Sequence, residues 1–276
     1  MTAVRIDLTL RQAPPLRVDL RGLLPAALAE LGVAQIEQLR FGHGRDTVPL
    51  AEWFSVQRHE TDDAAPALRL VGDCSRFDRI GTGLAAGSLT VEGPAGDYVG
   101  AGMTGGELLV QGDAGLLAAC EMAGGRLQVQ GSVGDWAASA LPGNLDGMRG
   151  GSFIVGGDAG QRFGDRMRRG TAVIHGRAGD LLASRMVAGT IAVAGAVGAQ
   201  PGYGMRRGSL VLAGPPCTPG PTFVRAIADV PVAWQLLARS LARHGGAFAR
   251  LAQRRMQRHL GDLSAAGKGE LILVEP

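Results

Sequence analysis

Seven arginines recur at closely spaced positions of a repeated sequence unit, and their guanidinium groups are the most specific chemistry that the chain offers. Arg149, Arg168 and Arg206 share one column, Arg169 and Arg207 share the next, and Arg166 and Arg185 lie two positions before the first. A guanidinium group holds a carboxylate through two parallel hydrogen bonds, which the ammonium of lysine cannot do. Because seven like charges along one edge repel one another without counter-charges, this arginine edge predicts an acidic ligand or an acidic partner. A solvated face is the alternative interpretation.

Familiar motifs of catalysis and nucleotide binding are missing from the sequence. It contains no nucleophile elbow, no P-loop and no H-E-x-x-H pair. Gly-x-x-Gly spacings recur, but without the strand, turn and helix that a phosphate-binding loop needs, so we interpret them as corners of the chain. The five histidines are scattered, and we expect surface or packing roles for them: His43, His59, His175, His244 and His259.

The acidic and thiol side chains form no recognisable catalytic pair either. Asp113 and Asp158 occupy equivalent Gly-Asp-Ala-Gly corners, where aspartate is a natural turn residue. Cys74, Cys120 and Cys217 are isolated and match neither a disulfide framework nor the spacing of a metal or cluster site. We therefore expect no catalytic residue, no metal site and no cofactor bound tightly by this chain.

The arginines are positioned by a glycine-framed unit, G-x-(apolar)-x-(apolar)-x-G. It begins at Gly87, Gly106, Gly125, Gly151, Gly170, Gly189 and Gly208, in steps of 19, 19, 26, 19, 19 and 19 residues. The first six copies continue as G-x-x-G-x-x-x-[G/A], and their paired glycines are Gly93, Gly96, Gly112, Gly115, Gly131, Gly134, Gly157, Gly160, Gly176, Gly179, Gly195 and Gly198. A fixed period of this kind indicates one structural unit stacked on copies of itself. Glycine at the corners is expected to allow backbone conformations that a side chain would obstruct.

Within each copy the third and fifth residues are apolar, as in Leu108 and Val110. Period-two alternation turns these residues inward. The residue between them points outward, and along the chain it is Thr90, Leu109, Gln128, Ile154, Val173, Ala192 and Val211. We therefore predict a mainly β fold, a parallel β-helix-like solenoid of about seven coils with a small α/β N-terminal cap and C-terminal helices. Such folds more often present surfaces than house chemistry.

Six of the eight methionines share one register, three residues before the next copy begins. They are Met103, Met122, Met148, Met167, Met186 and Met205. A thioether array could hold a soft metal, but no cysteine or histidine joins this column. We interpret it instead as a core ladder, in which flexible methionine fills the space between coils.

Three domains are predicted along the chain. Residues 1–66 form the α/β cap, with an edge strand near Val4–Leu10 and a short helix at Pro25–Leu31, where proline suits the first turn. Residues 67–214 form the repeat domain, which begins with a degenerate coil at Leu68–Asp73. Residues 215–276 form a C-terminal helical segment that ends in a strand at Gly269–Glu275.

The outer face of the later coils needs a cover, because the outward residues from Ile154 to Val211 are apolar. Helices predicted at Pro231–Arg243 and Ala247–Leu260 are one candidate, and a partner protein is the other. If the helices are too short for this task, the lone chain is expected to associate. The extra residues near Ser139–Leu145 predict a surface loop, which is either a contact face or a neutral insertion.

Composition narrows the class of partner. The chain has 276 residues, a formal net charge of +3 and a single lysine, Lys268. Interleaved aromatic residues are missing and the N-terminal region carries many acids, so no nucleic-acid partner is expected. No signal peptide and no apolar run of bilayer length are recognised, so we predict a cytoplasmic protein without a membrane partner.

Between Gly87 and Gly214 the repeats resemble those of the C subunit of formylmethanofuran dehydrogenase. A representative copy is Gly151-Ser-Phe-Ile-Val-Gly-Gly-Asp-Ala-Gly-Gln-Arg-Phe-Gly-Asp-Arg-Met-Arg-Arg-Gly170. In that family the subunit is a β-helical scaffold without the metal centres. The archaeal complex is a tungsten or molybdenum iron–sulfur dehydrogenase, and its bacterial counterpart is a formyltransferase/hydrolase complex. The lysine-poor composition, rich in alanine and arginine, favours the bacterial one.

The resemblance implies a hetero-oligomer and a one-carbon carrier. In the bacterial complex a formyl group passes from tetrahydromethanopterin to a methanofuran-type carrier and is then hydrolysed to formate. An amidohydrolase-like subunit and a formyltransferase subunit carry these reactions, so this chain would be a non-catalytic scaffold that binds both. Glutamate carboxylates of the carrier are the implied ligand of the arginine edge, with an acidic partner as the competing one. Two alternatives remain, the C subunit of a formylmethanofuran dehydrogenase and a stand-alone domain like the glutamate synthase C-terminal domain, which shares the repeat.

Overall fold

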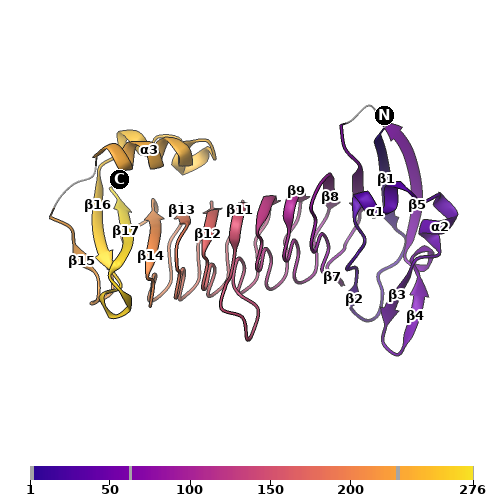
Figure 1. Cartoon of the computed structure of the whole chain (residues 1–276), viewed down its shortest axis with the longest axis horizontal. Helices are drawn as coiled ribbons and strands as arrows, with labels where there is room; N and C mark the ends of the chain where they lie inside the picture. The colour runs from indigo at the N-terminus through magenta and orange to yellow at the C-terminus, as the bar shows by residue number, and fades with distance from the viewer. Residues whose placement is uncertain (1–2, 62–63, 228–230, 276) are drawn as a thin grey trace.

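The structure, a computed structural model, describes residues 3–61, 64–227 and 231–275. It is mainly β, and its glycine-framed repeats lie one behind another along the long axis of the molecule (Figure 1). Equivalent apolar residues of neighbouring strands lie side by side in parallel pairs, with Leu68 opposite Leu89 and Leu89 opposite Leu108. The stretch at Leu68 is therefore the first unit of the stack. The stacked strands are β6 (Ala67–Val71), β8 (Ser88–Glu92), β9 (Thr104–Val110), β10 (Gly124–Val129), β11 (Arg149–Val155), β12 (Arg169–Ile174), β13 (Thr190–Val193), β14 (Arg207–Leu212) and β17 (Lys268–Val274).

Aspartate side chains at the corners of the repeats cap the backbone of the next repeat. Oδ1 of Asp113 accepts a hydrogen bond from the backbone N–H of Ser132 at 2.7 Å, and Oδ1 of Asp158 accepts one from Arg177 at 2.7 Å. The Arg177 backbone N–H, followed by its side chain, holds the pKa of the Asp158 carboxyl below its ordinary value. A second column repeats the arrangement, from Asp97 to Leu116, from Asp135 to Gln161 and from Asp180 to Ala199. These aspartates are thus turn residues, as predicted, that also join one repeat to the next.

The paired glycines are required by the close approach of neighbouring repeats. A Cβ at Gly115 would lie 2.0 Å from Asp97 Oδ1, and a Cβ at Gly176 would lie 2.3 Å from Asp158 Oδ1. The framing glycines have a different reason, because Gly170 has a φ of +94°, in the left-handed region that favours glycine. The predicted corner conformations are confirmed for the framing glycines, whereas most paired glycines are needed for space.

The interior of the stack is filled by the inward apolar residues and by the methionine column. All six methionines of the column are 0% exposed, which confirms the predicted core ladder. Five of the methionines pack against the framing glycine of the following repeat, as Met167 does, whose Cε lies 3.1 Å from a Cβ built at Gly189; Met205 packs against Gly269 of β17. Phe153 and Phe163 stack in the same core with ring centroids 5.6 Å apart. Sulfur, aromatic and aliphatic groups therefore form one continuous apolar interior.

The N-terminal cap adds two further strands to the stack. It contains β1 (Ala3–Leu10), β2 (Val18–Asp19), α1 (Pro25–Ala29), α2 (Val33–Glu37), β3 (Arg40–His43), β4 (Asp46–Pro49), a 3₁₀ turn (Leu50–Glu52), β5 (Phe54–Thr61) and, within the first repeat, β7 (Phe77–Asp78) that pairs with β2. The helix predicted at Pro25 is confirmed. The prediction of an edge strand is wrong, because β1 lies between β6 and β5. Ile6 and Leu8 of β1 lie in the core and Asp7 between them is buried as well, as suits an inner strand, and β5 supplies the actual edge.

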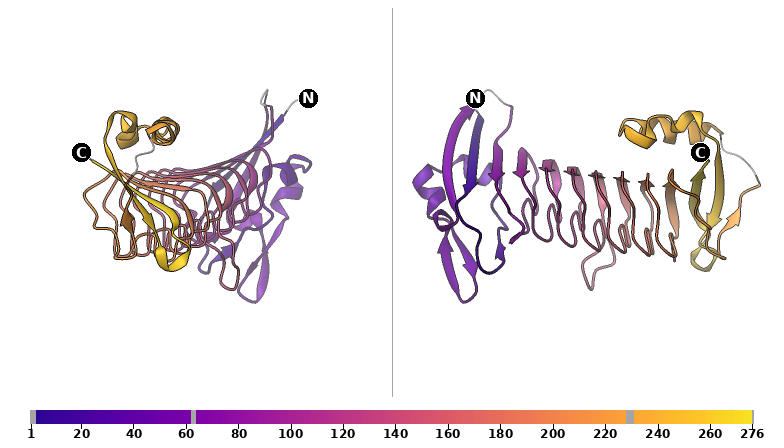
Figure 2. Two further views of the ribbon diagram at one scale, coloured as in Figure 1. Left: turned by 60° about the vertical axis from the view of Figure 1, so that its left-hand side comes forward. Right: turned by 180° about the vertical axis from the view of Figure 1, so that it is seen from behind.

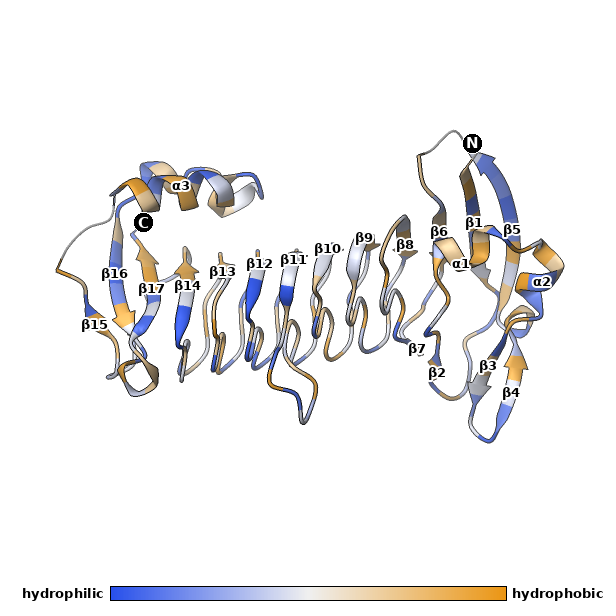
Figure 3. Cartoon of the chain, in the orientation of Figure 1, coloured by the Kyte–Doolittle hydropathy of each residue, from blue (hydrophilic) through white to orange (hydrophobic). Residues whose placement is uncertain are grey.

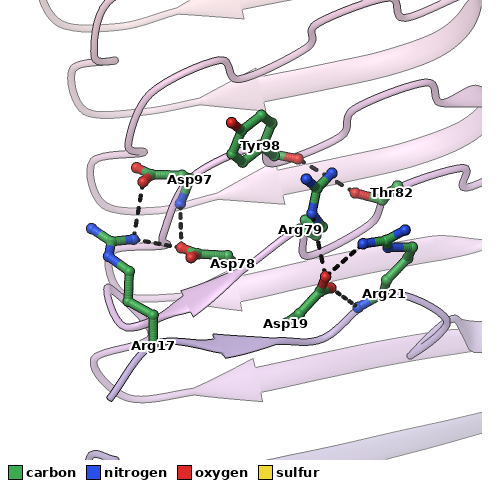
Figure 4. A network of polar contacts seen from close by, with 8 residues as sticks. All are labelled: Arg17, Asp19, Arg21, Asp78, Arg79, Thr82, Asp97 and Tyr98. Atoms are coloured by element: carbon green, nitrogen blue, oxygen red, sulfur yellow. Dashed lines mark hydrogen bonds and ion pairs between the residues drawn. The ribbon is translucent and has the colours of Figure 1, made fainter. Parts of the chain in front are cut away.

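Arginines join the cap to the first repeats (Figure 4). Arg17 forms ion pairs with Asp78 and, at 3.1 Å, with Asp97. The backbone N–H of Asp97 donates to Asp78 Oδ1 at 2.8 Å, so both carboxylates belong to the aspartate columns of the corners. Arg79, in the first repeat, pairs with Asp19 of β2 at 3.3 Å. The cap thereby supplies positive charge to the first two stacked carboxylates.

The described residues of the C-terminal segment contain one α-helix rather than the two predicted. It comprises β15 (Val224–Arg225), α3 (Pro231–Ala242), 3₁₀ turns at Gly246–Phe248, Leu251–Gln253 and Leu263–Ala265, β16 (Met256–Gly261) and β17. The prediction of a helix over Ala247–Leu260 is wrong, because β16 pairs antiparallel with β17 and satisfies the backbone groups of that strand. Over the described ranges the main sheet has 13 strands in the order β15-β16-β17-β14-β13-β12-β11-β10-β9-β8-β6-β1-β5.

Helix α3 covers the outer face of the last repeats (Figures 1 and 2). Val173, Ala192 and Val211 are 0% exposed and share a core cluster with Trp234 and Leu241 of α3. The helix carries both apolar and hydrophilic segments, as expected of an amphipathic cover (Figure 3). The chain therefore covers its own apolar strip, and the predicted reason for the lone chain to associate does not hold. None of the helices described is long and apolar enough to cross a membrane.

Candidate functional site

Four of the seven predicted arginines surround one hollow beside the inserted loop. This hollow of about 630 Å³ is lined by Arg166, Arg168, Arg185 and Arg206, together with Tyr203. Arg166 and Arg185 have φ values of 59° and 53°, so both project from tight corners of the chain. The structure thus brings four arginines of the arginine edge together around one hollow.

The other three arginines lie apart from this hollow. Arg149, Arg169 and Arg207 are the first residues of β11, β12 and β14, and all three are exposed. A guanidinium nitrogen of Arg149 lies 3.5 Å from the backbone oxygen of Glu121. Within the described ranges no carboxylate forms an ion pair with Arg169, Arg206 or Arg207. These groups remain available to an acidic ligand.

Two aspartates supply counter-charges that were not predicted from the sequence. Asp165 is only 2% exposed, and it accepts hydrogen bonds from Arg185 at 2.9 Å and 2.6 Å and from the Ser184 hydroxyl at 2.5 Å. Arg166 lies 3.9 Å from the same carboxylate, and Arg168 pairs with Asp146 at 3.1 Å. The expectation of seven uncompensated charges is therefore wrong for three of them. Asp146 and Asp165 each lie two residues before a methionine of the column, Met148 and Met167, so an acid at this position of two neighbouring repeats was the signal that the sequence offered.

The inserted loop forms a second, more apolar hollow on its other side. It has a volume of about 500 Å³ and is lined by Trp136, Leu141 and Leu145 among others, with Arg166 and Arg185 at the boundary with the first hollow. Glu121 fixes the loop, because its side chain accepts hydrogen bonds from the backbone of Leu141 at 3.2 Å and from the Asn144 amide at 2.5 Å. Leu145 is 73% exposed at the tip. The loop thus presents an anchored apolar surface next to guanidinium groups, as a contact face would.

The cysteines are poorly suited to nucleophilic chemistry. Burial, the largest cause in each case, raises the pKa of the Cys74 and Cys120 thiols to about 12. Burial also raises the pKa of Cys217. Since the thiolate is the reactive form, these thiols stay protonated and inert at neutral pH.

The described residues contain no group of three or more His, Cys, Asp or Glu side chains that could hold a metal ion. The histidines lie in different places. His43 contacts Trp53 edge-on at 5.7 Å, and His59 lies 3.4 Å from Asp7 in the cap. His175 and His244 both line a third hollow, at the end of α3. His175 and His244 are thus brought together in the structure.

Comparison with known proteins places these features in a family. A family model described as the GXGXG motif matches residues 76–215. The C subunit of the formyltransferase/hydrolase complex Fhc of Methylorubrum extorquens is 42% identical over 89 residues, 32% of this chain and 32% of that protein. The C subunit of the molybdenum-containing formylmethanofuran dehydrogenase 1 of Methanosarcina barkeri is 35% identical over 87 residues, 31% of this chain and 29% of that protein. Each of these alignments spans about a third of the relative's length or less.

A solved structure extends the similarity to the whole chain. A chain of the crystal structure of the formyltransferase/hydrolase complex FhcABCD from Methylorubrum extorquens, in complex with methylofuran, superimposes with a TM-score of 0.90 at 40% identity. The match covers 98% of this chain and 100% of that chain. This chain therefore belongs to the GXGXG-motif family and is a homologue of the C subunit of the formyltransferase/hydrolase complex.

Proposed function

We propose that this chain is the non-catalytic scaffold subunit of a formyltransferase/hydrolase complex. Its structural match to a chain of FhcABCD over 98% of its length carries the proposal. In this proposal it forms a parallel β-helix-like solenoid that binds an amidohydrolase-like subunit and a formyltransferase subunit. Those partners would transfer a formyl group from tetrahydromethanopterin to a methanofuran-type carrier and release formate.

The geometry of the chain supports a scaffold. Corner aspartates such as Asp113 and Asp158 are engaged by backbone N–H groups of the next repeat. The interior is filled with apolar side chains, and the buried thiols are held protonated. The corner carboxylates thus join one repeat to the next and the thiols lie in the interior, while the arginines and the inserted loop face outward.

The C subunit of a formylmethanofuran dehydrogenase is the second candidate. The homologues at 35% identity from Methanosarcina barkeri and 33% identity from Methanothermobacter thermautotrophicus support it. Native purification followed by mass spectrometry separates the two. Partners with formyltransferase and amidohydrolase sequences support the first candidate, whereas a molybdenum or tungsten iron–sulfur subunit supports the second.

The purified chain alone is expected to show no formyl transfer and no hydrolysis of a formylated carrier. The sister subunits are proposed to carry both reactions, so activity should appear only after they are added. Turnover is measured by formate release, with the reconstituted complex as the positive control. Turnover by the lone, metal-free chain would contradict the scaffold role.

Within this proposal the arginine edge holds the glutamate carboxylates of the carrier between the two active sites. Arg168 and Arg206 line the same hollow, and Arg206 forms no ion pair within the described ranges. Exposed pairs are each worth at most about 1 kcal/mol and are screened by salt, so several contacts must act together. Such weak, exchangeable contacts suit a carrier that has to move.

Exchange of both Arg168 and Arg206 for glutamate is expected to slow the coupled reaction while each half-reaction keeps its rate with saturating free carrier. Coupled and separate assays at low salt measure this difference, and size-exclusion chromatography checks assembly. The matched control reverses two exposed charges in the cap, Arg11→Glu with Arg45→Glu, and should behave as the parent. Failure to assemble would show that the edge binds an acidic partner instead, and unchanged coupled turnover would discard both roles.

A further inference from the structure

A cationic hollow lies where the C-terminal end of α3 meets the sheet. It has a volume of about 400 Å³, and its walls include Arg126 of β10, His175 directly after β12, and Arg243 and His244 directly after α3. The hydroxyl-bearing residues Ser152 and Thr171 also line it. We call it the helix-end pocket. Its walls are rich in hydrogen-bond donors, and none of the described residues that line it carries a carboxylate.

The two arginines of the helix-end pocket have no acidic partner within the described ranges. Neither Arg126 nor Arg243 forms an ion pair there, and the Arg126 guanidinium donates to the Gln128 side chain at 3.3 Å. Glu107 is the register neighbour of Arg126 on β9, yet it makes no ion pair with it. Positive charge is therefore concentrated at the pocket without an ion pair to any carboxylate of the described residues.

The C-terminal end of α3 accounts for two of the basic residues in the helix-end pocket. The C-terminus of a helix carries partial negative charge, which favours cations such as Arg243 and His244 beside it. Arg126 and His175 come from the sheet, so the helix end gives no reason for them. His175 is also held in place, because its ring contacts Phe248 edge-on at 5.4 Å and packs against Gly246. The sheet and the end of α3 are separate elements, and both place cationic or hydrogen-bond-donating groups in the helix-end pocket.

The electrostatics of the histidines agree with this geometry. Burial lowers the pKa of His175. The pKa of His244 is lowered first by burial and then by the charges of Arg126, His175 and Arg243. An anion in the pocket would offset the lowering of the His244 pKa by these positive charges. It would also favour the protonated form of both imidazole rings.

We propose that the helix-end pocket binds a small multivalent oxyanion, a phosphate or a polycarboxylate, between Arg126 of the sheet and Arg243 of the helix end. The guanidinium groups donate charge-assisted hydrogen bonds from two walls, and His175 and His244 donate from the others. The site lies on the outer face of the sheet and shares no lining residue with the hollow of the arginine edge. It therefore does not depend on the proposed function.

Isothermal titration of the full chain with inorganic phosphate and with citrate tests this site, at a constant ionic strength of about 0.15 M set with chloride. Saturable binding of at least one probe is expected. Binding of phosphate alone assigns a phosphoryl ligand, and binding of citrate alone assigns a polycarboxylate. In parallel, NMR titration of the imidazole protons should show the pKa of His175 and His244 rising by about one unit when the probe is bound.

Matched variants locate the binding. Arg126→Gln is expected to weaken binding by about tenfold or more, since it removes a charge-assisted hydrogen bond. Arg239→Gln removes the same charge from an exposed position of α3, outside the pocket, and should leave binding unchanged. No saturable binding of either probe, or equal binding by the parent and Arg126→Gln, would overturn the proposal.

Discussion

Exchange of Met167 for aspartate is expected to abolish the folded state of the chain. Met167 is 0% exposed in the interior of the stack, and its methyl group packs against the framing glycine Gly189 of the next repeat. Loss of a buried methionine side chain alone costs about 2–5 kcal/mol. An unpaired buried carboxylate adds several kcal/mol, against a total stability of about 5–15 kcal/mol for a typical domain.

Soluble yield and thermal unfolding followed by circular dichroism measure this effect. Met167→Leu is the matched control, because it keeps the volume and apolar character and should cost less than about 1.5 kcal/mol. If the aspartate variant were as soluble as the parent and unfolded at the same temperature, the methionine column would not be the core of the stack.

Gly176→Ala is expected to destabilise the chain by at least about 2 kcal/mol through steric conflict alone. The added Cβ would lie 2.3 Å from Asp158 Oδ1 and 2.4 Å from the backbone oxygen of Gly157. Both atoms belong to the preceding repeat, so a new side chain would push two repeats apart. It would also weaken the 2.7 Å hydrogen bond from the Arg177 N–H to Asp158.

Urea unfolding at equilibrium measures the change in the free energy of unfolding. Gly42→Ala is the control, since a Cβ at Gly42 in β3 meets nothing within 4 Å. This control should stay within about 0.5 kcal/mol of the parent. Equal midpoints for Gly176→Ala and Gly42→Ala would show that the repeats are not in close contact at this corner.

The parts of the fold that can be predicted from the sequence are those that recur in several repeats. Each methionine of the column and each inward residue such as Leu108 appears in several copies, so one interpretation is tested many times within one chain. Contacts that are not repeated along the stack leave no repeating pattern in the sequence. The counter-charges of the arginine edge were missed because an acid stands at their position in two repeats only, as Asp146 beside Arg168 and Asp165 beside Arg185.

The error at the C-terminus has a related physical cause. Residues Ala247–Leu260 carry apolar residues at helical spacing, but β16 forms from Met256 because β17 offers it a complete row of backbone partners. A partner strand distant in sequence overrides local preference there. The helix-end pocket was missed similarly, since Arg126 and Arg243 are far apart in the chain and meet only once α3 lies over the sheet.

The aspartate columns at the corners have a consequence for how this molecule can change in length. Every bond of these columns joins a repeat only to its immediate neighbour, as from Asp113 to Ser132 and from Asp158 to Arg177. Duplication or deletion of one 19-residue unit would therefore leave the bonds at the other junctions intact and change the residues at one junction only. Such a change would move the cap relative to α3 by one strand spacing, about 4.8 Å. The spacing between partners bound at the cap and at α3 could thus change in equal steps, while each partner keeps the same binding surface.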